Sequence, residues 1–235
     1  MADNLIYRYE IKYALYKSDF IELNNIIKSL CEKDIHADIN GGYHVRSLYF
    51  DDYYDNAYVD KEASVLDRYK FRIRTYNINN NLIKLEKKIK KGKLCAKQST
   101  SITPNDYDNV MAKNYNSLLS YDGEMVKKFY TECQNSLLTP KIIIDYKREA
   151  YIYKFGNDYI RLTFDSDIAW ATNSLNIFDD KICLHNLKNS MANVFELKCS
   201  SLVPELLMDI IHPIANYKTS FSKYQLCRME KENLL

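Results

Sequence analysis

Glycine, proline and long apolar runs are all scarce in this sequence. Only 5 glycines and 4 prolines occur among 235 residues, which excludes collagen-like, glycine-linker and proline-rich architectures. Few flexible joints remain, so we expect one domain over residues 1–235. No run of about 18 apolar residues is present, so we expect no membrane span. The formal net charge is only +2, which argues against nucleic acid as a partner.

Cysteine and histidine supply no motif for metal binding or nucleophilic catalysis. The 6 cysteines are scattered without a C-x-x-C pair, and none of the 4 histidines lies at metal-finger spacing from them. The N-terminal residues are charged, unlike those of a signal peptide. We therefore expect reduced thiols and a cytoplasmic protein.

Alternating and helical hydrophobic patterns predict an α+β protein with enough apolar and aromatic residues for a core. Strands are predicted over residues 6–15, 43–50, 67–77, 82–90, 93–102, 141–153, 158–170 and 193–200. Helices are predicted over residues 18–30, 53–63, from 103, 122–135 and 204–211. We expect Ser18 to cap the first helix, residues 79–81 to form a turn, and the ordered chain to end over residues 220–228.

The strand over residues 67–77 carries four cations on one face: Arg68, Lys70, Arg72 and Arg74. Side chains at alternate positions of a strand lie about 6.8 Å apart. In bulk water each neighbouring pair of like charges costs about 0.6 kcal/mol, and the cost rises several-fold in an enclosed site. A polyanion would offset this repulsion, because arginine matches phosphate oxygens with paired donors.

Cations also recur on the polar side of other predicted strands. These residues are Lys12, Lys84, Lys88, Arg148, Arg161 and Lys198. For any one pair, a solvated outer face explains the pattern. Across five strands, the pattern favours a closed antiparallel β-barrel with a charged lumen, whose apolar side turns outward under helices.

Four acidic residues lie among these cations: Glu10, Glu86, Asp165 and Glu196. Mg²⁺ and Mn²⁺ prefer a few carboxylates together with phosphate oxygens, so all four are candidate metal ligands. Local salt bridges are the alternative, and we favour that alternative for Glu10 and Glu86. Glu196 is the strongest single candidate.

A series of short segments resembles the VTC domain, the polyphosphate polymerase branch of the triphosphate tunnel metalloenzymes, a superfamily that includes the CYTH domains. The segments are RYEIKY (residues 8–13), SLYFD (47–51), RYKFRIR (68–74), LEKK (85–88), DYKR (145–148), IRLTFD (160–165), FELK (195–198) and SKY (222–224). They follow in the same order and spread from about residue 6 to residue 226. The resemblance implies an antiparallel barrel whose tunnel binds triphosphates and polyphosphate.

The resemblance also implies roles for individual residues. Arg72 and Arg74 match the strand that grips nucleotide phosphates, and Glu196 matches the metal-binding glutamate. Other matches to tunnel-lining cations are Lys12, Lys88, Lys97, Arg148, Arg161 and Lys198. Ser222 and Lys223 match a late Ser-Lys pair that closes the tunnel. Arg68, Lys70 and Lys84 are added as neighbouring substrate-binding cations.

The opening strand favours the polymerase branch over the hydrolase branch. Hydrolases of the superfamily usually open with Glu-x-Glu-x-Lys, whereas this chain has Arg8, Glu10 and Lys12 at these positions. We expect transfer of the terminal phosphate of ATP to inorganic polyphosphate, with Mn²⁺ or Mg²⁺ as cofactor. Hydrolysis of a triphosphate and non-catalytic polyphosphate binding remain alternatives. The sequence indicates no oligomeric state.

Overall fold

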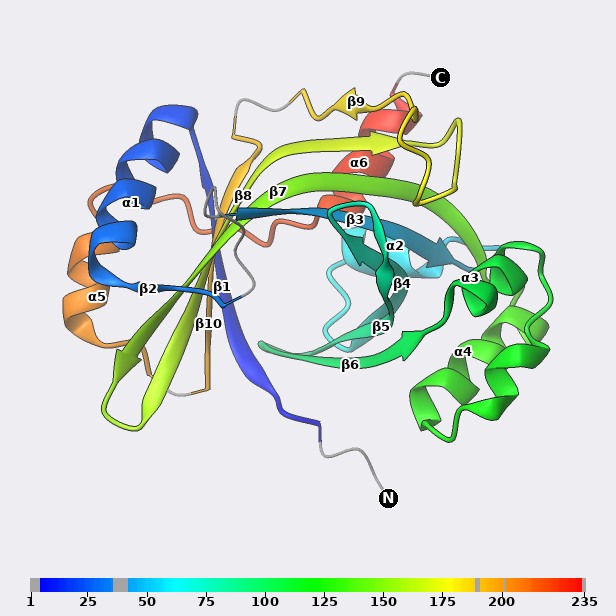
Figure 1. Ribbon diagram of the computed structural model, residues 1–235. Coiled ribbons are helices and arrows are strands. Elements are labelled where there is room, and N and C mark those ends of the chain that lie inside the picture. The colour runs from blue at the N-terminus through cyan, green and yellow to red at the C-terminus, as the bar shows by residue number, and fades with distance from the viewer. Residues whose placement is uncertain (1–4, 36–41, 189–190, 201, 234–235) are drawn as a thin grey trace. The chain divides into compact units, whose positions relative to one another are not determined.

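The computed structural model describes residues 5–35, 42–188, 191–200 and 202–233. The chain is an α+β protein with antiparallel strands and, in the described ranges, six α-helices (Figure 1). It divides into two compact units. Unit 1 comprises residues 1–6, 45–144 and 170–185, and unit 2 comprises residues 7–44, 145–169 and 186–235. Each unit is described by itself.

The strands of unit 1 are antiparallel and follow one another along the chain. They are β3 (Gly42–Asp51, which begins in unit 2), β4 (Arg68–Tyr76), β5 (Asn79–Lys91) and β6 (Leu94–Ile102). β4 pairs with both β3 and β5, and β5 with β6. The predicted turn at residues 79–81 is wrong, because the chain reverses at Asn77 and Ile78, which both have positive φ. Two consecutive left-handed residues suit the twist of a tight hairpin.

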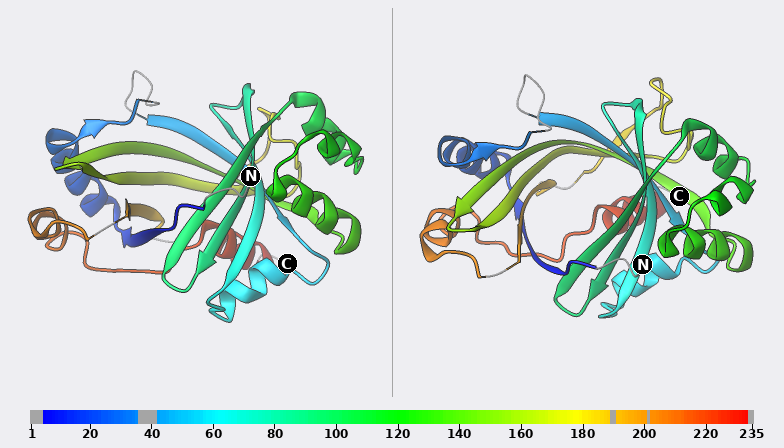
Figure 2. Two further views of the ribbon diagram at one scale, coloured as in Figure 1. Left: turned by 90° about the horizontal axis from the view of Figure 1, so that it is seen from below. Right: turned by 60° about the horizontal axis from the view of Figure 1, so that its bottom comes forward.

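Helices cover the apolar face of the unit 1 strands. They are α3 (Pro104–Met111), a 3₁₀ turn (Asn116–Ser120) and α4 (Glu124–Asn135), whereas α2 (Asn56–Glu62) contacts β4 and adds no residue to this apolar cluster. α3 and α4 lie beside β5 and β6 in both views of Figure 2. Phe129 of α4 meets Phe50 of β3 and Phe71 of β4 edge to face, each at 5.2 Å between ring centroids. The predicted helix start at Thr103 is confirmed by a capping box with Asp106.

The strands of unit 2 are joined across long sequence distances. β1 (Arg8–Leu15) pairs with β10 (Asn193–Cys199), which pairs with β8 (Asp158–Ala171). β8 forms the predicted hairpin with β7 (Thr139–Phe155, which begins in unit 1), and the turn between them contains Gly156 at φ 54°. Two short strands complete the set, β2 (Glu32–Lys33), which pairs with β7, and β9 (His185–Asn186).

Helices α1 (Lys17–Leu30) and α5 (Glu205–Ile211) cover the apolar face of unit 2 (Figure 1). Leu23 and Ile27 of α1 share a buried cluster with Phe164, Phe195 and Leu207. The predicted cap at Ser18 is wrong, because the helix starts from Tyr16 and the Ser18 hydroxyl donates to Asp19. The sequence also failed to predict α6 (Lys223–Glu232), which begins after Ser222.

The two sides of these strands differ in an unusual way. Apolar residues meet the helices, while the opposite side buries charged residues that include Arg72, Glu86, Arg148, Asp165 and Glu196. A solvated outer face is therefore the wrong explanation for these residues. No helix in the described part of the chain is long and apolar enough to cross a membrane.

Candidate phosphate-binding site

In unit 1, strand register arranges the polar side chains in three rows. Tyr49, Arg72, Glu86 and Ser99 are consecutive cross-strand partners, as are Ser47, Arg74, Lys84 and Ser101. Lys70, Lys88 and Lys97 form the third row. Residues that face each other across antiparallel strands have Cβ atoms about 5 Å apart. We call these residues the unit 1 polar face.

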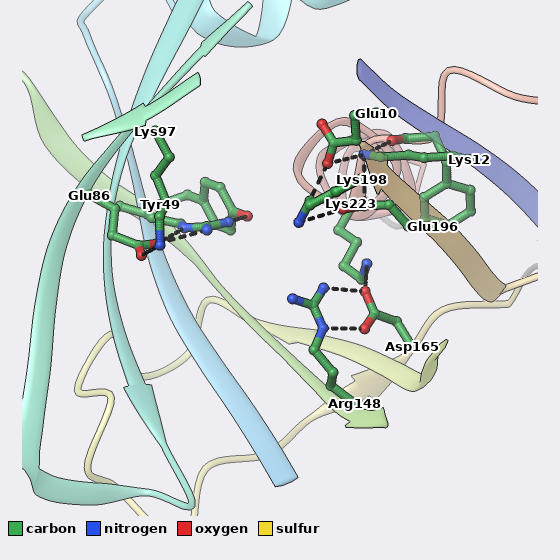
Figure 3. Close-up of polar contacts among 12 residues, drawn as sticks. Glu10, Lys12, Tyr49, Glu86, Lys97, Arg148, Asp165, Glu196, Lys198 and Lys223 are labelled. Carbon is green, nitrogen blue, oxygen red and sulfur yellow. Dashed lines mark hydrogen bonds and ion pairs between the residues drawn. The ribbon is translucent and has the colours of Figure 1, made fainter. Parts of the chain in front are cut away.

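Glu86 is the carboxylate at the centre of the unit 1 polar face, and it is fully buried. Its Oε2 accepts from Nε and Nη2 of Arg72 at 2.8 and 2.7 Å, and its Oε1 accepts from Lys97 Nζ at 2.7 Å (Figure 3). Burial alone would raise the pKa of Glu86, but Arg72, Arg74 and Lys97 outweigh burial and hold it well below its usual range. Glu86 therefore stays ionised and fixes two cations.

Arg72 and Arg74 are both buried and are held at several atoms. Arg72 Nη1 donates to the phenol oxygen of Tyr49 at 3.0 Å, and Arg74 Nε donates to the Ser47 hydroxyl at 2.9 Å. Lys70 Nζ lies 5.4 Å from the centroid of the Tyr49 ring, within cation–π range. Held arginines are preorganised for phosphate, because less side-chain freedom is lost on binding.

The remaining predicted cations of unit 1 differ in setting. Lys84 Nζ donates to the Ser101 hydroxyl at 2.7 Å, and Lys88 lies in register between Lys70 and Lys97. Arg68 donates to the carbonyl of Val65, in the segment before its own strand. Arg46, also buried, lies on the apolar side and donates to the carbonyls of Ile177 and Asp179, so its role is structural.

In unit 2, four alternating charges form a compact group on β1 and β10. Lys198 Nζ lies 2.6 Å from Glu196 Oε1 and 3.9 Å from Glu10 Oε1. Lys12 Nζ lies 3.4 Å from Glu196 Oε2 and 3.7 Å from Glu10 Oε1, and donates to the Phe221 carbonyl at 3.0 Å (Figure 3). The register explains the pattern, because Glu10 faces Lys198 and Lys12 faces Glu196.

Asp165 anchors a second group in unit 2 and is fully buried. Its two oxygens accept from Nε and Nη2 of Arg148 at 2.6 and 2.7 Å, and Lys223 Nζ donates to Oδ2 at 2.5 Å (Figure 3). Burial alone would raise the pKa of Asp165, but Arg148 and Lys223 hold it well below its usual range. Burial likewise disfavours the charge of Arg148, but Asp165 raises its pKa further above the ordinary value.

Arg161 belongs to a third contact group of unit 2. Its Nη2 lies 2.8 Å from Asp34 Oδ2 and donates to the phenol oxygen of Tyr43 at 3.1 Å. Together with the two groups above, these charges make up what we call the unit 2 polar face. Its members are Glu10, Lys12, Asp34, Arg148, Arg161, Asp165, Glu196, Lys198 and Lys223.

Sequence reasoning placed most of these residues on the correct side of their strands but missed several partners. Tyr49 is part of the SLYFD segment, but no role was predicted for it. It lies two residues after Ser47, so its side chain points to the same side of β3. Tyr146 also received no role, and Lys223 Nζ lies 4.6 Å from its ring centroid. Ser222 was predicted to bind substrate, and the structure shows its side chain accepting from the Gln225 backbone at the start of α6.

The family resemblance implies a divalent metal, and the contacts of the four candidate carboxylates show which of them could bind it. Both oxygens of Glu86 and of Asp165 already accept from cations at 2.5–2.8 Å. Glu10 and Glu196 share Lys12 and Lys198: Lys198 lies 2.6 Å from Glu196 Oε1, and the other three contacts are 3.4–3.9 Å long. Among the described residues no group of three His, Cys, Asp or Glu could hold a metal. Mg²⁺ is commonly held by one or two carboxylates plus substrate phosphates, so Glu196 and Glu10 fit such a metal.

Comparison with known families identifies the chain. The sequence profile of the VTC domain matches residues 7–229, so the chain belongs to the VTC domain family. No curated protein matches the chain by sequence.

Two solved structures share the fold at low sequence identity. One is a proposed adenylyl cyclase from Hippeastrum, described as having a dominant triphosphatase activity. It is 14% identical with a TM-score of 0.54, and the match covers 95% of each chain. The other is a proposed adenylate cyclase from Bacillus halodurans. It is 11% identical with a TM-score of 0.53, and the match covers 92% of this chain and 93% of that one.

Proposed function

We propose that this protein is a polyphosphate polymerase, which transfers the terminal phosphate of ATP to the end of a growing polyphosphate chain. The observation that carries the proposal is the charge of the unit 1 polar face. Six lysines and arginines there surround the single carboxylate of Glu86 in the registered rows. Arg72 and Arg74 are buried, and holding them beside four further cations, which are partly buried or exposed, is costly unless an anion offsets the charge. A phosphate chain carries many negative charges and matches arginine donors.

As part of this proposal, both units act as one domain whose strands form the closed barrel of a triphosphate tunnel, lined by the polar faces. Membership of the VTC family supports this, because the family match runs through both units. We also propose that the protein works in the cytoplasm. The six cysteines are free thiols, as expected in a reducing compartment.

The proposed chemistry depends on positioning and charge rather than on a nucleophilic side chain. The acceptor is the end of a phosphate chain, which is already deprotonated, so no general base is needed. Arg72 and Arg74 would bind the phosphates of ATP, while Arg148, Lys198 and Lys223 would stabilise charge on the transferring group. Glu196 and Glu10 would hold the divalent metal, which when bound neutralises charge on phosphate oxygens.

Hydrolysis of a triphosphate is a second candidate function. The specific observation in its favour is the Glu10 and Glu196 pair, since two neighbouring carboxylates could hold metal for attack by water. The Hippeastrum protein with the similar fold is itself described as having a dominant triphosphatase activity.

Incubation with ATP and Mn²⁺ tests these functions. Polymerase activity gives long-chain polyphosphate on a gel, whereas triphosphatase activity releases orthophosphate without chains. The variant Arg72→Ala/Arg74→Ala should lose the product. Lys147→Ala is the matched control, since its side chain is 70% exposed and pairs with Asp167. Lys84→Ala, at a half-buried position, serves if the double variant misfolds. Tight binding of polyphosphate without any turnover would contradict catalysis and favour a binding module.

A further inference from the structure

Tyr49 is a buried phenol among the cations of the unit 1 polar face. Its side chain is on β3 and the residue is only 4% exposed. Its oxygen accepts from Arg72 Nη1 at 3.0 Å, and the Arg72 guanidinium and Lys70 Nζ lie 5.8 and 5.4 Å from its ring centroid. The Tyr49 side chain lies beside the Glu86–Lys97 pair in Figure 3. Apart from its contact with Arg72, this phenol has no part in the proposed reaction.

The charges around Tyr49 favour a second anion on this face. The Tyr49 phenol interacts electrostatically with Arg72, Lys70 and Arg74 of β4. The carboxylate of the unit 1 polar face is Glu86 on β5. Both oxygens of Glu86 are already taken by Arg72 and by Lys97 of β6. The charged residue on the unit 1 part of β7, Lys141, is paired with Asp55 at 3.0 Å. A negative charge on the phenol oxygen would reduce repulsion among the three cations of β4.

We propose that Tyr49 is a proton-linked counter-ion of the unit 1 polar face, a phenolate while the face is empty that takes up one proton when a phosphate chain binds. The proton comes from solvent, and no other bond changes. The ligand half of this inference rests on the proposed function, because it requires that the face binds phosphate. Tyr49 then acts as a positioning residue that holds Arg72 before the ligand arrives.

The acidity of Tyr49 supports this assignment. Burial alone would raise the pKa of the phenol, but Arg72, Lys70 and Arg74 outweigh burial and lower it to about 7. A phosphate chain adds negative charge beside the phenol and so favours its protonated form. Above pH 7 binding therefore requires proton uptake, and the affinity for tripolyphosphate should fall by up to about tenfold per pH unit. Well below pH 7 the phenol is already protonated and this dependence disappears.

A spectroscopic titration tests the phenolate without any ligand. We expect the ultraviolet absorbance of one tyrosinate to appear with a midpoint near pH 7 in the wild type and to be absent in Tyr49→Phe. Tyr69→Phe is the matched control, because Tyr69 donates to Glu132 at 2.7 Å and its pKa is raised by burial and by Glu132. An unchanged step in Tyr49→Phe, or no step in the wild type, would overturn the inference.

Calorimetry with tripolyphosphate tests the link to phosphate. At pH 8, titrations in two buffers of different ionisation enthalpy should report uptake of about one proton per bound chain, and the tyrosinate absorbance should fall on binding. If Tyr49→Phe does not fold, the fall of absorbance in the wild type still decides the question. Binding without proton uptake overturns this inference and leaves the proposed function intact. No binding at any pH overturns the proposed function and the phosphate-linked half together.

Discussion

The unit 1 polar face and the unit 2 polar face contain similar numbers of cations but very different numbers of carboxylates. In unit 1, Glu86 stands among Lys70, Arg72, Arg74, Lys84, Lys88 and Lys97. In unit 2, four carboxylates pair with five lysines and arginines. The first face therefore has an excess of positive charge for a polyanion. The second face is nearly balanced, because most of its charges form ion pairs with one another. Its neighbouring carboxylates Glu10 and Glu196 are the candidate metal ligands.

Removing Asp165 should have the largest effect, because it neutralises two cations of the balanced face. Asp165→Asn leaves the buried Arg148 without a full counter-charge, and we expect a loss of about 3–5 kcal/mol in the free energy of unfolding. Urea unfolding measures this loss. Asp167→Asn is the control, since its exposed pair with Lys147 should contribute less than about 1 kcal/mol. Equal losses in the two variants would contradict the argument.

Acid should weaken both faces, through Glu86 in one and Asp165 in the other. The pKa of each carboxyl is lower in the folded than in the unfolded chain, so the unfolded chain binds more protons in acid. Their stabilisation is complete above about pH 5 and falls below about pH 4, at about 1.4 kcal/mol per pH unit for each carboxyl.

Urea unfolding between pH 6 and pH 3 measures this dependence. Glu86→Gln should be less stable at pH 6 but should show a shallower loss below pH 4, because one of the carboxyls with a lowered pKa is gone. An identical slope in the wild type and in Glu86→Gln would exclude Glu86 as a source of acid sensitivity.

Replacing Glu196 should distinguish metal-dependent turnover, which we assign to unit 2, from phosphate binding, which we assign to unit 1. Glu196→Gln removes a candidate metal ligand of unit 2, and we expect turnover with Mn²⁺ to fall by more than about tenfold. Its affinity for tripolyphosphate without metal should change little, because the unit 1 cations are intact. Calorimetry and a turnover assay measure the two quantities. A loss of metal-free binding equal to the loss of turnover would show that Glu196 is not specific to metal.

Added salt should have the smallest of these effects. It should lower the affinity for tripolyphosphate but hardly change the free energy of unfolding. Raising the salt from about 0.1 M to 0.5 M shortens the Debye length from about 10 Å to about 4 Å. Tripolyphosphate affinity should therefore fall. The urea midpoint should hardly change, since the Arg72–Glu86 and Arg148–Asp165 pairs are buried. A salt-independent affinity would argue against an electrostatic phosphate site.

The sequence predicted much of the fold and part of the candidate site. The alternation of residues 67–77 fixed which side of β4 carries Arg72 and Arg74, and the strand itself is confirmed. Turn and cap positions were less predictable. Asn77 and Ile78 form the turn that was expected at residues 79–81. Ser222 caps α6, a helix that the sequence pattern did not predict. These features depend on local competition between several possible caps and turns, which a sequence pattern does not resolve.

The sequence by itself determined the two-residue period of charge along the strands, because successive side chains of any strand point to opposite sides. It thereby separated Arg72, Glu86, Lys198 and Glu196 from the apolar core. Only the tertiary structure decided which charges meet. Lys223 reaches Asp165 from 58 residues further along the chain, and Tyr49 accepts from Arg72 through strand register. Such contacts depend on long-range pairing and on burial, which removes water and makes each opposite charge decisive.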